Sequence, residues 1–386
     1  MRIGIIAPCA VPFVVGGAEK LWWGLERYIN EHTEHIADII KLPSREQDLF
    51  GLAASYRAFS GLDLSGFDLV LSTKYPAWAV QHDRHVVYLQ HKLRGLYDAY
   101  PGAIEIPEKL LRIPAIASLL TLAEKVESRS AQLGDLLKQI SALELEDDPE
   151  IIAAGRIPGP LARRIVHVID ACLLSPRRIA RFAAISHEVA ARADYFPPDV
   201  TVKVLHHPTS VPIQRSEHFD YLFTASRLDG PKRIGLLIDA MHLSRTEIPL
   251  KIAGDGPQAE LLRAQAAGDP RIHFLGHVSE RELINLYANS LAVLFVPFKE
   301  DYGLITLEAM LAGKAVLTAS DSGGTGELVV HEHTGFIVPS EAQAIAKAID
   351  RLATNRARTI EFGVAGFAAA QAVTWQPIVD WLTGKA

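Results

Sequence analysis

Short apolar segments recur along the whole chain, and stretches long enough for a helix separate them. They occupy residues 3–7, 36–42, 69–72, 86–89, 182–185, 202–205, 221–224, 250–253, 272–275, 292–296, 315–318 and 336–338. Nearly continuous hydrophobic strands that alternate with helices are typical of parallel sheets covered on both faces. The pattern therefore predicts an α/β chain in which each half forms one doubly wound, Rossmann-like domain.

The boundary between the two domains is expected in the segment 207–212, which contains Pro208 and Pro212. Proline disfavours helix at the residue before it, and the segment separates one closing strand from the next opening strand. We therefore predict an N-terminal domain over 1–207 and a C-terminal domain over 208–368. Residues 369–386 are expected to form a final helix that packs back towards the N-terminal domain, because Trp375 and Trp381 need a surface to cover.

Residues of about 103–180 break the strand–helix alternation and predict a helical insert in the N-terminal domain. The later part of this insert is both apolar and basic, with arginines at 163, 164, 177, 178 and 181. One interpretation is a helix packed on its own domain with a solvated basic face. The other is a basic amphipathic helix that lies on an anionic membrane surface.

Composition excludes several classes of protein. With 386 residues and a formal net charge of -6, the chain is long enough for two domains and lacks the basic footprint of a nucleic-acid binder. Its two cysteines, Cys9 and Cys172, provide no disulfide framework, and no apolar stretch reaches the roughly 18 residues of a spanning helix. We expect a cytoplasmic protein, with peripheral contact at the inner face of the membrane left open. No His, Cys or acidic cluster predicts a metal site.

The strongest chemical signal is the segment 297–310, which follows an expected strand and contains Glu300, Gly303 and Glu308. Gly303 stands where a helix begins around Leu304, so a ligand can approach the backbone and the free N–H groups of the helix start. A diphosphate or a sugar hydroxyl fits such a position. Glu308, one turn into an apolar helix, is either a structural carboxylate or a ligand for paired hydroxyls.

The distance between the two glutamates argues against a glycoside hydrolase. The carboxyl groups of a retaining glycosidase lie about 5 Å apart, and those of an inverting one about 6.5–9.5 Å apart. Eight helical residues already span about 12 Å. Glu300 and Glu308 are therefore expected to serve different parts of one ligand.

A second signal, at the end of the first strand of the C-terminal domain, contains Arg227 and Lys232. Open parallel sheets bind their ligands at the carboxyl ends of the strands. The forked charge of arginine and the compact charge of lysine suit a diphosphate. A solvated basic loop is the alternative.

Weaker signals come from turns at other strand ends. Gly16 and Gly17 open the first helix and could bring amides close to a phosphate or an acceptor. They do not complete the GxGxxG fingerprint of a dinucleotide-binding enzyme, which disfavours a nicotinamide-dependent dehydrogenase. Gly254 and Val278 follow strands on the same expected edge as Arg227, where backbone groups can form a nucleobase slot. His91 ends a strand of the N-terminal domain and is a candidate catalytic residue, although lone histidines are more often structural.

Together these motifs resemble the retaining glycosyltransferases of family 4, which are also described as glycosyl transferases group 1 and include glycogen-synthase-like enzymes. The resemblance covers nearly all of the C-terminal domain and the start of the N-terminal one. Its residues are Gly16–Glu19, Ser226–Leu228, Lys232, Gly254–Pro257, Glu300, Gly303, Glu308–Met310, Gly313, Gly323–Gly324, Glu327 and Thr334–Val338.

The resemblance implies a GT-B fold, in which two Rossmann-like domains face a central cleft. It also implies a metal-independent hexosyltransferase (EC 2.4) that transfers a sugar from a UDP-sugar or GDP-sugar, UDP being favoured, and needs no cofactor. Arg227 and Lys232 would bind the diphosphate and stabilise the leaving group. Glu308 would bind the ribose, and Glu300, with the Gly303 and Leu304 amides, the transferred sugar.

The same resemblance implies that Val278 reads the base through its backbone, with Gly254 beside it. Gly16 and Gly17 would face the phosphates or the acceptor, and His91 would lie near the transferred sugar. The implied acceptor is a saccharide or a lipid-linked hydroxyl in polysaccharide or glycolipid synthesis. Two alternatives stay open: a nucleotide-sugar epimerase on the same fold and a catalytically silent nucleotide-sugar-binding protein.

Overall fold

A computed structural model describes the chain except for residues 11–15, 103–104, 129–131, 146 and 386. It divides into two compact units. The first unit contains Met1–Ile185, Val189–Leu205 and Val379–Ala386, and the second contains Ser186–Glu188 and His206–Ile378. Helices α8 (His187–Ala190) and α16 (Gln376–Thr383) contain residues of both units.

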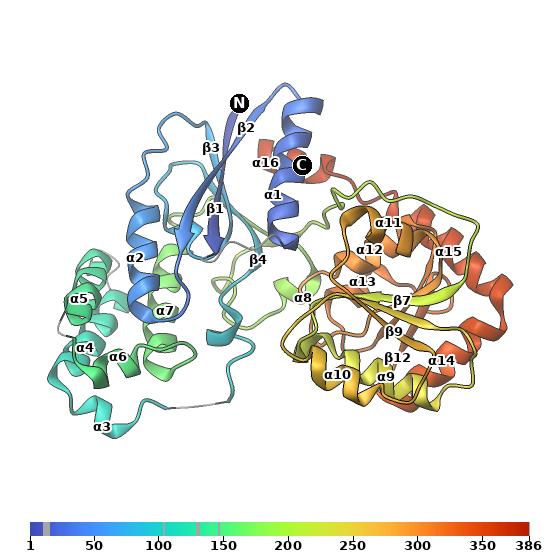
Figure 1. Cartoon of the computed structure of the whole chain (residues 1–386). Helices are drawn as coiled ribbons and strands as arrows, with labels where there is room; N and C mark the ends of the chain where they lie inside the picture. The colour runs from blue at the N-terminus through green and yellow to red at the C-terminus, as the bar shows by residue number, and fades with distance from the viewer. Residues whose placement is uncertain (11–15, 103–104, 129–131, 146, 386) are drawn as a thin grey trace. The chain divides into compact units, whose positions relative to one another are not determined.

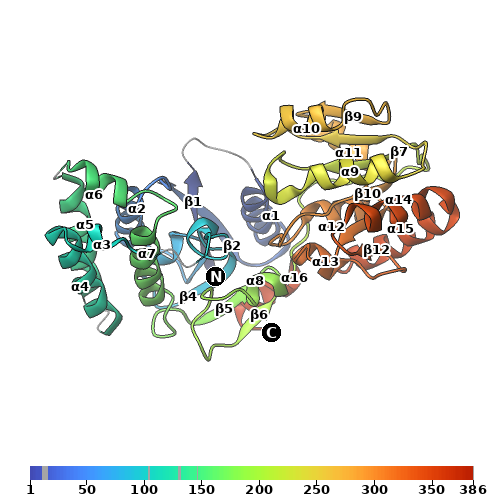
Figure 2. The same ribbon diagram turned by 90° about the horizontal axis from the view of Figure 1, so that it is seen from below.

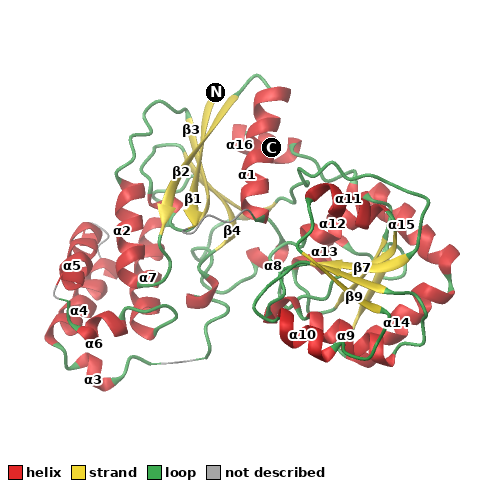
Figure 3. Ribbon diagram, viewed as in Figure 1, coloured by secondary structure: helices red, strands yellow, loops and turns green. Residues whose placement is uncertain are grey.

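The first unit is built on a six-stranded parallel sheet in the order β2-β1-β3-β4-β5-β6. Its strands are β1 (Arg2–Ala10), β2 (Ile36–Ser44), β3 (Leu69–Lys74), β4 (His85–His91), β5 (Arg181–Ala184) and β6 (Val202–Val204). Register is direct at the centre, where Ile3 pairs with Ala37 on one side and with Leu69 on the other. These strands are apolar along their length because helices cover the sheet (Figure 3).

The remaining elements of the first unit are helical. They are α1 (Gly17–His32), α2 (Leu49–Ser60), η1 (Ala77–Ala79), η2 (Arg94–Leu96), α3 (Glu108–Leu111), α4 (Pro114–Ser128), α5 (Leu133–Leu145), α6 (Pro149–Ala154) and α7 (Pro160–Leu173). Helices α3 to α6 gather beside α2 and α7, on the side away from the sheet (Figures 1 and 2). This region is the helical insert expected between residues 103 and 180.

The basic helix of the insert is α7, and it packs within its unit. Its apolar face, which includes Leu161, Ile165 and Ile169, is buried. Arg164 forms an ion pair with Glu127 of α4. These contacts favour the interpretation of a packed helix, because an apolar face that is already covered is not available to a lipid surface. Membrane contact itself stays an untested expectation.

The second unit has its own six-stranded parallel sheet in the order β12-β11-β10-β7-β8-β9. Its strands are β7 (Tyr221–Ala225), β8 (Leu250–Ala253), β9 (Ile272–Gly276), β10 (Ser290–Leu294), β11 (Ala315–Ala319) and β12 (Gly335–Val338). Its helices are η4 (Gly230–Lys232), α9 (Ile234–Leu243), α10 (Ala259–Gln265), α11 (Glu280–Ala288), α12 (Leu304–Leu311), α13 (Gly324–Leu328), α14 (Ala342–Thr354) and α15 (Arg356–Ala370).

Both faces of the second sheet are packed. Along β7, Leu222 joins the cluster under α9, α10 and α14, whereas its neighbour Phe223 joins the cluster under α11 and α12. On β10, Leu294 joins the first of these clusters and its neighbour Val293 joins the second. Because successive side chains of a strand point to opposite faces, both must be apolar when both faces are covered.

All twelve strands expected from the sequence are present, with ends that differ by no more than three residues. The prediction of two doubly wound parallel sheets is therefore confirmed. Among the residues that the structure describes, no helix is long and apolar enough to cross a bilayer.

Candidate functional site

The loops at the carboxyl edge of the second sheet are joined to one another by backbone hydrogen bonds. The Phe298 amide donates to the carbonyl of Pro231 (2.8 Å), which links the loop after β10 to the loop after β7. The Glu300 amide donates to the carbonyl of Ser322 (3.1 Å), and the Gly324 amide donates to the carbonyl of Glu300 (2.9 Å). The chain around Glu300 is thus fixed on two sides by the neighbouring strand-end loops.

Two of the predicted site residues contact each other directly. Lys232 Nζ lies 2.6 Å from Glu300 Oε2, and each side chain is only about one-fifth exposed. Lys232 ends η4, after β7, and Glu300 lies in the loop after β10, the strand that pairs with β7. Parallel strands all end at one edge of a sheet, and this edge therefore brings together residues that are far apart in the sequence.

Arg233 holds three of these loops in place, a role that the sequence did not reveal. Its guanidinium donates two hydrogen bonds to Asp321, at 2.7 and 2.8 Å, and others to the carbonyls of Val296 (2.8 Å) and Pro297 (2.6 Å). The bonds from Arg233 hold the pKa of Asp321 below its usual value. Such bidentate geometry is specific to arginine, so this residue fixes the base of the site.

Gly303 begins the helix that contains Glu308. It is the N-cap of α12 and has a φ of 87°, which lies in the left-handed region where glycine carries no steric cost. A Cβ at this position would overlap Thr325 Oγ1 and come within 3.2 Å of the Thr325 Cα and Cβ atoms. The glycine is therefore required by backbone conformation and by close packing.

Glu308 is buried, with 4% of its surface exposed. Its Oε1 accepts a hydrogen bond from the Thr209 hydroxyl, and its Oε2 accepts one from the Tyr287 hydroxyl, both at 3.0 Å. A buried carboxylate needs such donors to remain charged. Neither partner was predicted, because Thr209 lies in the expected linker and Tyr287 has the spacing of an ordinary core residue.

The remaining predicted residues of the second unit lie on the same edge. Arg227 has a side chain that is 72% exposed and lies 3.7 Å from an Asp229 carboxylate oxygen. Gly254 has a φ of 124°, and a Cβ there would overlap the Ser226 carbonyl oxygen. Loop packing therefore requires a glycine at this position, and a contact between Gly254 and a nucleotide stays a prediction. Val278 lies just before α11 and packs at the margin of the apolar cluster beneath that helix.

The predicted residues of the first unit lie at strand and helix ends. His91 ends β4, and its Nδ1–H donates to the Lys92 carbonyl (2.7 Å). Gly16 is the N-cap of α1, and its amide donates to the Glu19 carboxylate (2.9 Å). Gly17 is the first residue of α1, and residues 11–15 of the preceding turn lie outside the described part of the chain. The roles of these three residues stay predictions.

Glu327 organises the chain segments that enter the second unit. It accepts hydrogen bonds from the amides of His187 (2.8 Å) and Glu188 (2.7 Å), and His206 Nε2 lies 3.0 Å from its Oε2. Burial alone would raise the pKa of Glu327, but these donors outweigh it and lower the pKa below its usual value. This anchor explains a glutamate for which the sequence suggested no role beyond the resemblance.

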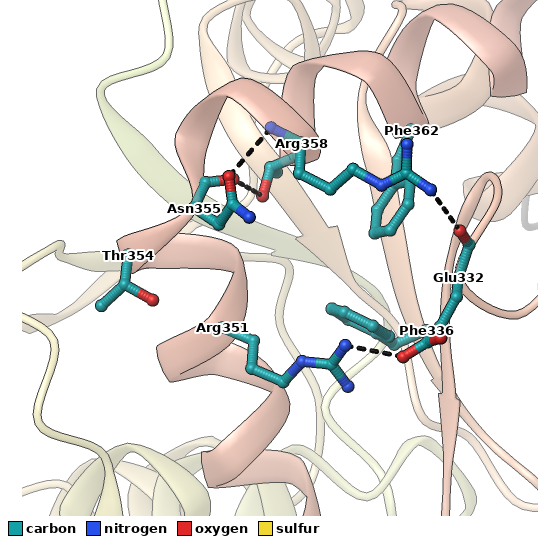
Figure 4. A pocket seen from close by; sticks show the side chains of 8 residues that line it. Glu332, Phe336, Arg351, Thr354, Asn355, Arg358 and Phe362 are labelled. Atoms are coloured by element: carbon teal, nitrogen blue, oxygen red, sulfur yellow. Dashed lines mark hydrogen bonds and ion pairs between the residues drawn. The ribbon is translucent and has the colours of Figure 1, made fainter.

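A separate pocket of about 330 Å³ lies at the opposite, amino-terminal edge of the second sheet (Figure 4). Arg351 and Arg358 are among the residues that line it. The Glu332 carboxylate lies 2.6 Å from the Arg351 guanidinium, and Arg358 is paired with Glu361. The arginine charges are thus already balanced by glutamates, and the pocket is distinct from the edge that contains Lys232 and Glu300.

Among the described residues, no three His, Cys, Asp or Glu side chains gather into a group that could hold a metal ion. The expectation of a metal-independent enzyme stays a prediction.

Comparison with known proteins identifies the class of this fold. HepE of Anabaena, in a crystal structure with UDP and glucose, superposes with a TM-score of 0.62 at 16% sequence identity, over 100% of both chains. With its two parallel six-stranded sheets, the chain has the GT-B fold.

The family is identified by sequence. Residues 210–365 match the family model described as glycosyl transferases group 1. The second unit therefore contains a domain of the glycosyl transferases group 1 family. The predicted fold and group 1 resemblance are thus confirmed, whereas assignment to family 4 stays a prediction.

Two curated relatives match parts of the chain. D-rhamnosyltransferase WbpZ of Pseudomonas aeruginosa is 35% identical over 117 residues, which are 29% of this chain and 30% of that protein. Glycogen synthase of Mycobacterium tuberculosis is 29% identical over 213 residues, 51% of this chain and 50% of that enzyme. The chain therefore covers no more than half of either relative.

Proposed function

We propose that this protein is a retaining glycosyltransferase that moves a sugar from a nucleotide-diphosphate donor to an acceptor hydroxyl. The observation that carries the proposal is the Lys232–Glu300 ion pair beside Gly303, at the carboxyl edge of a group 1 domain. An enzyme of this kind needs a cation for the diphosphate, an acid for the sugar hydroxyls and approachable helix amides. We assign these three roles to Lys232, Glu300 and the start of α12.

Binding of the donor begins with charge. The Arg227 side chain is exposed, and Lys232 follows it five residues later in the chain after β7. A diphosphate would draw Lys232 away from Glu300, because two phosphate groups offer more negative charge than one carboxylate. Glu300 would then accept hydrogen bonds from hydroxyls of the transferred sugar. The contact between Lys232 and Glu300 thus keeps both groups in place until the donor replaces it.

Recognition of the nucleoside uses the other residues of the edge. Glu308 would bind the ribose hydroxyls, and the backbone at Val278 and Gly254 would meet the base. The amides of Gly303 and Leu304, at the positive end of the α12 dipole, would complete the grip on the phosphates and sugar. We favour UDP over GDP as the nucleotide, and HepE, which shares the fold, was crystallised with UDP.

The transfer step forms one bond and breaks another. The acceptor oxygen attacks the anomeric carbon as the bond from that carbon to the terminal phosphate oxygen breaks. The departing phosphate takes the acceptor proton on the same face, so configuration is retained and a nucleoside diphosphate is released. Charge that develops on the leaving group would be stabilised by Arg227 and Lys232, which is electrostatic catalysis by preorganised cations.

The acceptor proposed is a saccharide or a lipid-linked hydroxyl, in polysaccharide or glycolipid synthesis. The 35% identity to the D-rhamnosyltransferase WbpZ over 117 residues supports a hexosyl donor. Through the resemblance, His91 would lie near the transferred sugar, and Gly16 and Gly17 near the phosphates or acceptor. We place the protein in the cytoplasm, with contact at the inner face of the membrane depending on the acceptor.

Calorimetry with UDP, GDP and ADP tests the donor site. We expect Arg227→Ala and Glu308→Ala each to weaken binding of the preferred nucleotide by at least about tenfold, as removal of a charged hydrogen-bonding partner does. Arg351→Ala is the matched control, because this arginine lies in the pocket at the opposite edge of the same sheet. Unchanged affinity in both site variants would rule the proposal out. Incubation of the donor without acceptor, followed by NMR, would detect an epimerase.

A further inference from the structure

The Glu308 carboxylate is held by two hydroxyl groups that come from different parts of the second unit. Tyr287 belongs to α11 and is fully buried, with its ring edge-on to Phe223 at 5.2 Å. Thr209 lies in the segment before β7, and its hydroxyl also accepts a hydrogen bond from the Val211 amide (3.1 Å). The Thr209 hydroxyl donates to Glu308 Oε1 and the Tyr287 hydroxyl donates to Glu308 Oε2, each at 3.0 Å.

These two contacts fix the plane of the carboxylate. A glutamate side chain has three rotatable bonds, and one hydrogen bond would leave its end free to turn. A donor on each oxygen removes that freedom. An ionised carboxylate can accept about four hydrogen bonds, so two hydroxyls do not exhaust its capacity. Burial, together with the neighbouring Glu308 charge, raises the pKa of Tyr287 well above its usual value, so the phenol stays a donor at physiological pH.

The position of Tyr287 in the chain connects two parts of the same ligand site. Helix α11 begins with a Ser279 N-cap, directly after Val278, and reaches Tyr287 two turns later. The backbone proposed to meet the base and the hydroxyl that contacts Glu308 therefore belong to one rigid element. This arrangement sets the distance between the base contact and the ribose carboxylate.

We infer that Tyr287 and Thr209 are positioning residues for the donor nucleotide, which orient the Glu308 carboxylate towards the 2′- and 3′-hydroxyls of its ribose. The inference rests on the proposed function, because it assigns a role within the same donor site. The two residues act through Glu308 and do not themselves contact the ligand. Their loss should thus reduce specifically the binding that depends on ribose hydroxyls.

The test compares UDP with 2′-deoxy-UDP, and GDP with 2′-deoxy-GDP, by calorimetry on the full chain. In the wild type, loss of the 2′-hydroxyl should weaken binding of the preferred nucleotide about tenfold, the effect of one hydrogen bond to a charged group. In Tyr287→Phe we expect the normal nucleotide to bind about five- to tenfold more weakly and the deoxy nucleotide no more than about twofold. The discrimination between them should therefore fall towards unity.

Matched variants separate positioning from a general packing effect. Tyr221→Phe is the control, because the Tyr221 hydroxyl donates to the carbonyl of Leu286, next to Tyr287, and has no contact with Glu308. It should preserve the discrimination. Thr209→Val should reduce it as Tyr287→Phe does, and Thr209→Ser, which keeps a hydroxyl, should restore it. Thr209→Val alone decides the matter if Tyr287→Phe fails to fold.

The outcomes distinguish this inference from the proposed function. Suppose that Tyr287→Phe and Thr209→Val keep the wild-type preference for the normal over the 2′-deoxy nucleotide, while Glu308→Ala loses nucleotide binding. This result would overturn the positioning role and leave the proposed function standing. Unchanged binding of every nucleotide in Glu308→Ala would overturn both.

Discussion

Replacement of Gly303 by alanine should destabilise the second unit and disturb the donor site. The new residue would keep a φ of 87°, which costs an L-residue about 1–2 kcal/mol. Its Cβ would also overlap Thr325 Oγ1, and overpacking of this kind costs about 1–3 kcal/mol. We therefore expect a loss of about 2–5 kcal/mol.

Differential scanning calorimetry measures this loss. For a domain of about 150–250 residues, 1 kcal/mol shifts the Tm by about 2–4 °C, so Gly303→Ala should lower the Tm of the second unit by about 4–20 °C. The transition of that unit is identified as the one that a bound nucleotide raises.

Two further variants test whether the loss of stability in Gly303→Ala comes from the left-handed backbone and the overlap with Thr325. Gly326→Ala is the control, because a Cβ there meets nothing within 4 Å, and its Tm should not fall. In the double variant Gly303→Ala/Thr325→Ala, removal of the overlapping hydroxyl should recover about 1 kcal/mol or more. A Gly303→Ala protein that melts like Gly326→Ala would refute the reasoning.

Three other predictions follow from the same contacts. Glu300→Gln should bind UDP about three- to tenfold more tightly, because it removes a negative charge 2.6 Å from Lys232, and should transfer sugar more slowly; weaker UDP binding in calorimetry would contradict this. Arg233→Lys should lose its bidentate grip and about 2–3 kcal/mol of stability in thermal unfolding, whereas Arg263→Lys, at an exposed pair, should lose none. Burial lowers the pKa of His207 from 6.5 to about 4. Because the folded chain disfavours protonation of His207, the free energy of unfolding should fall by roughly 3 kcal/mol as the pH decreases from 6.5 to 4. If the free energy of unfolding of His207→Gln fell with pH as steeply as that of the wild type, His207 would not be the cause.

The sequence predicts the frame of this molecule well, because parallel sheets covered on both faces require unbroken apolar strands. The same logic brought Lys232 and Glu300 together, since parallel strands all end at one edge. The glycine in the loop after β10 was also predicted to begin a helix, and Gly303 does so.

Contacts between side chains of distant segments could not be predicted. Tyr287 precedes Glu308 by 21 residues and Thr209 precedes it by 99, and neither position carries a local pattern that marks a partner of a carboxylate. Arg233 was visible only as one more cation in a basic loop, although its geometry makes it a structural clamp. At Gly254, close packing against the Ser226 carbonyl gives a structural reason for the glycine that the sequence did not reveal.

The most direct measurement of the central claim is a crystal structure of the full chain with its preferred nucleoside diphosphate. We expect the diphosphate to contact Arg227 and Lys232, Lys232 to have left Glu300, and both Glu308 oxygens to accept hydrogen bonds from the ribose. A nucleotide bound elsewhere, or bound with its ribose turned away from Glu308 while the Lys232–Glu300 pair stays closed, would contradict it.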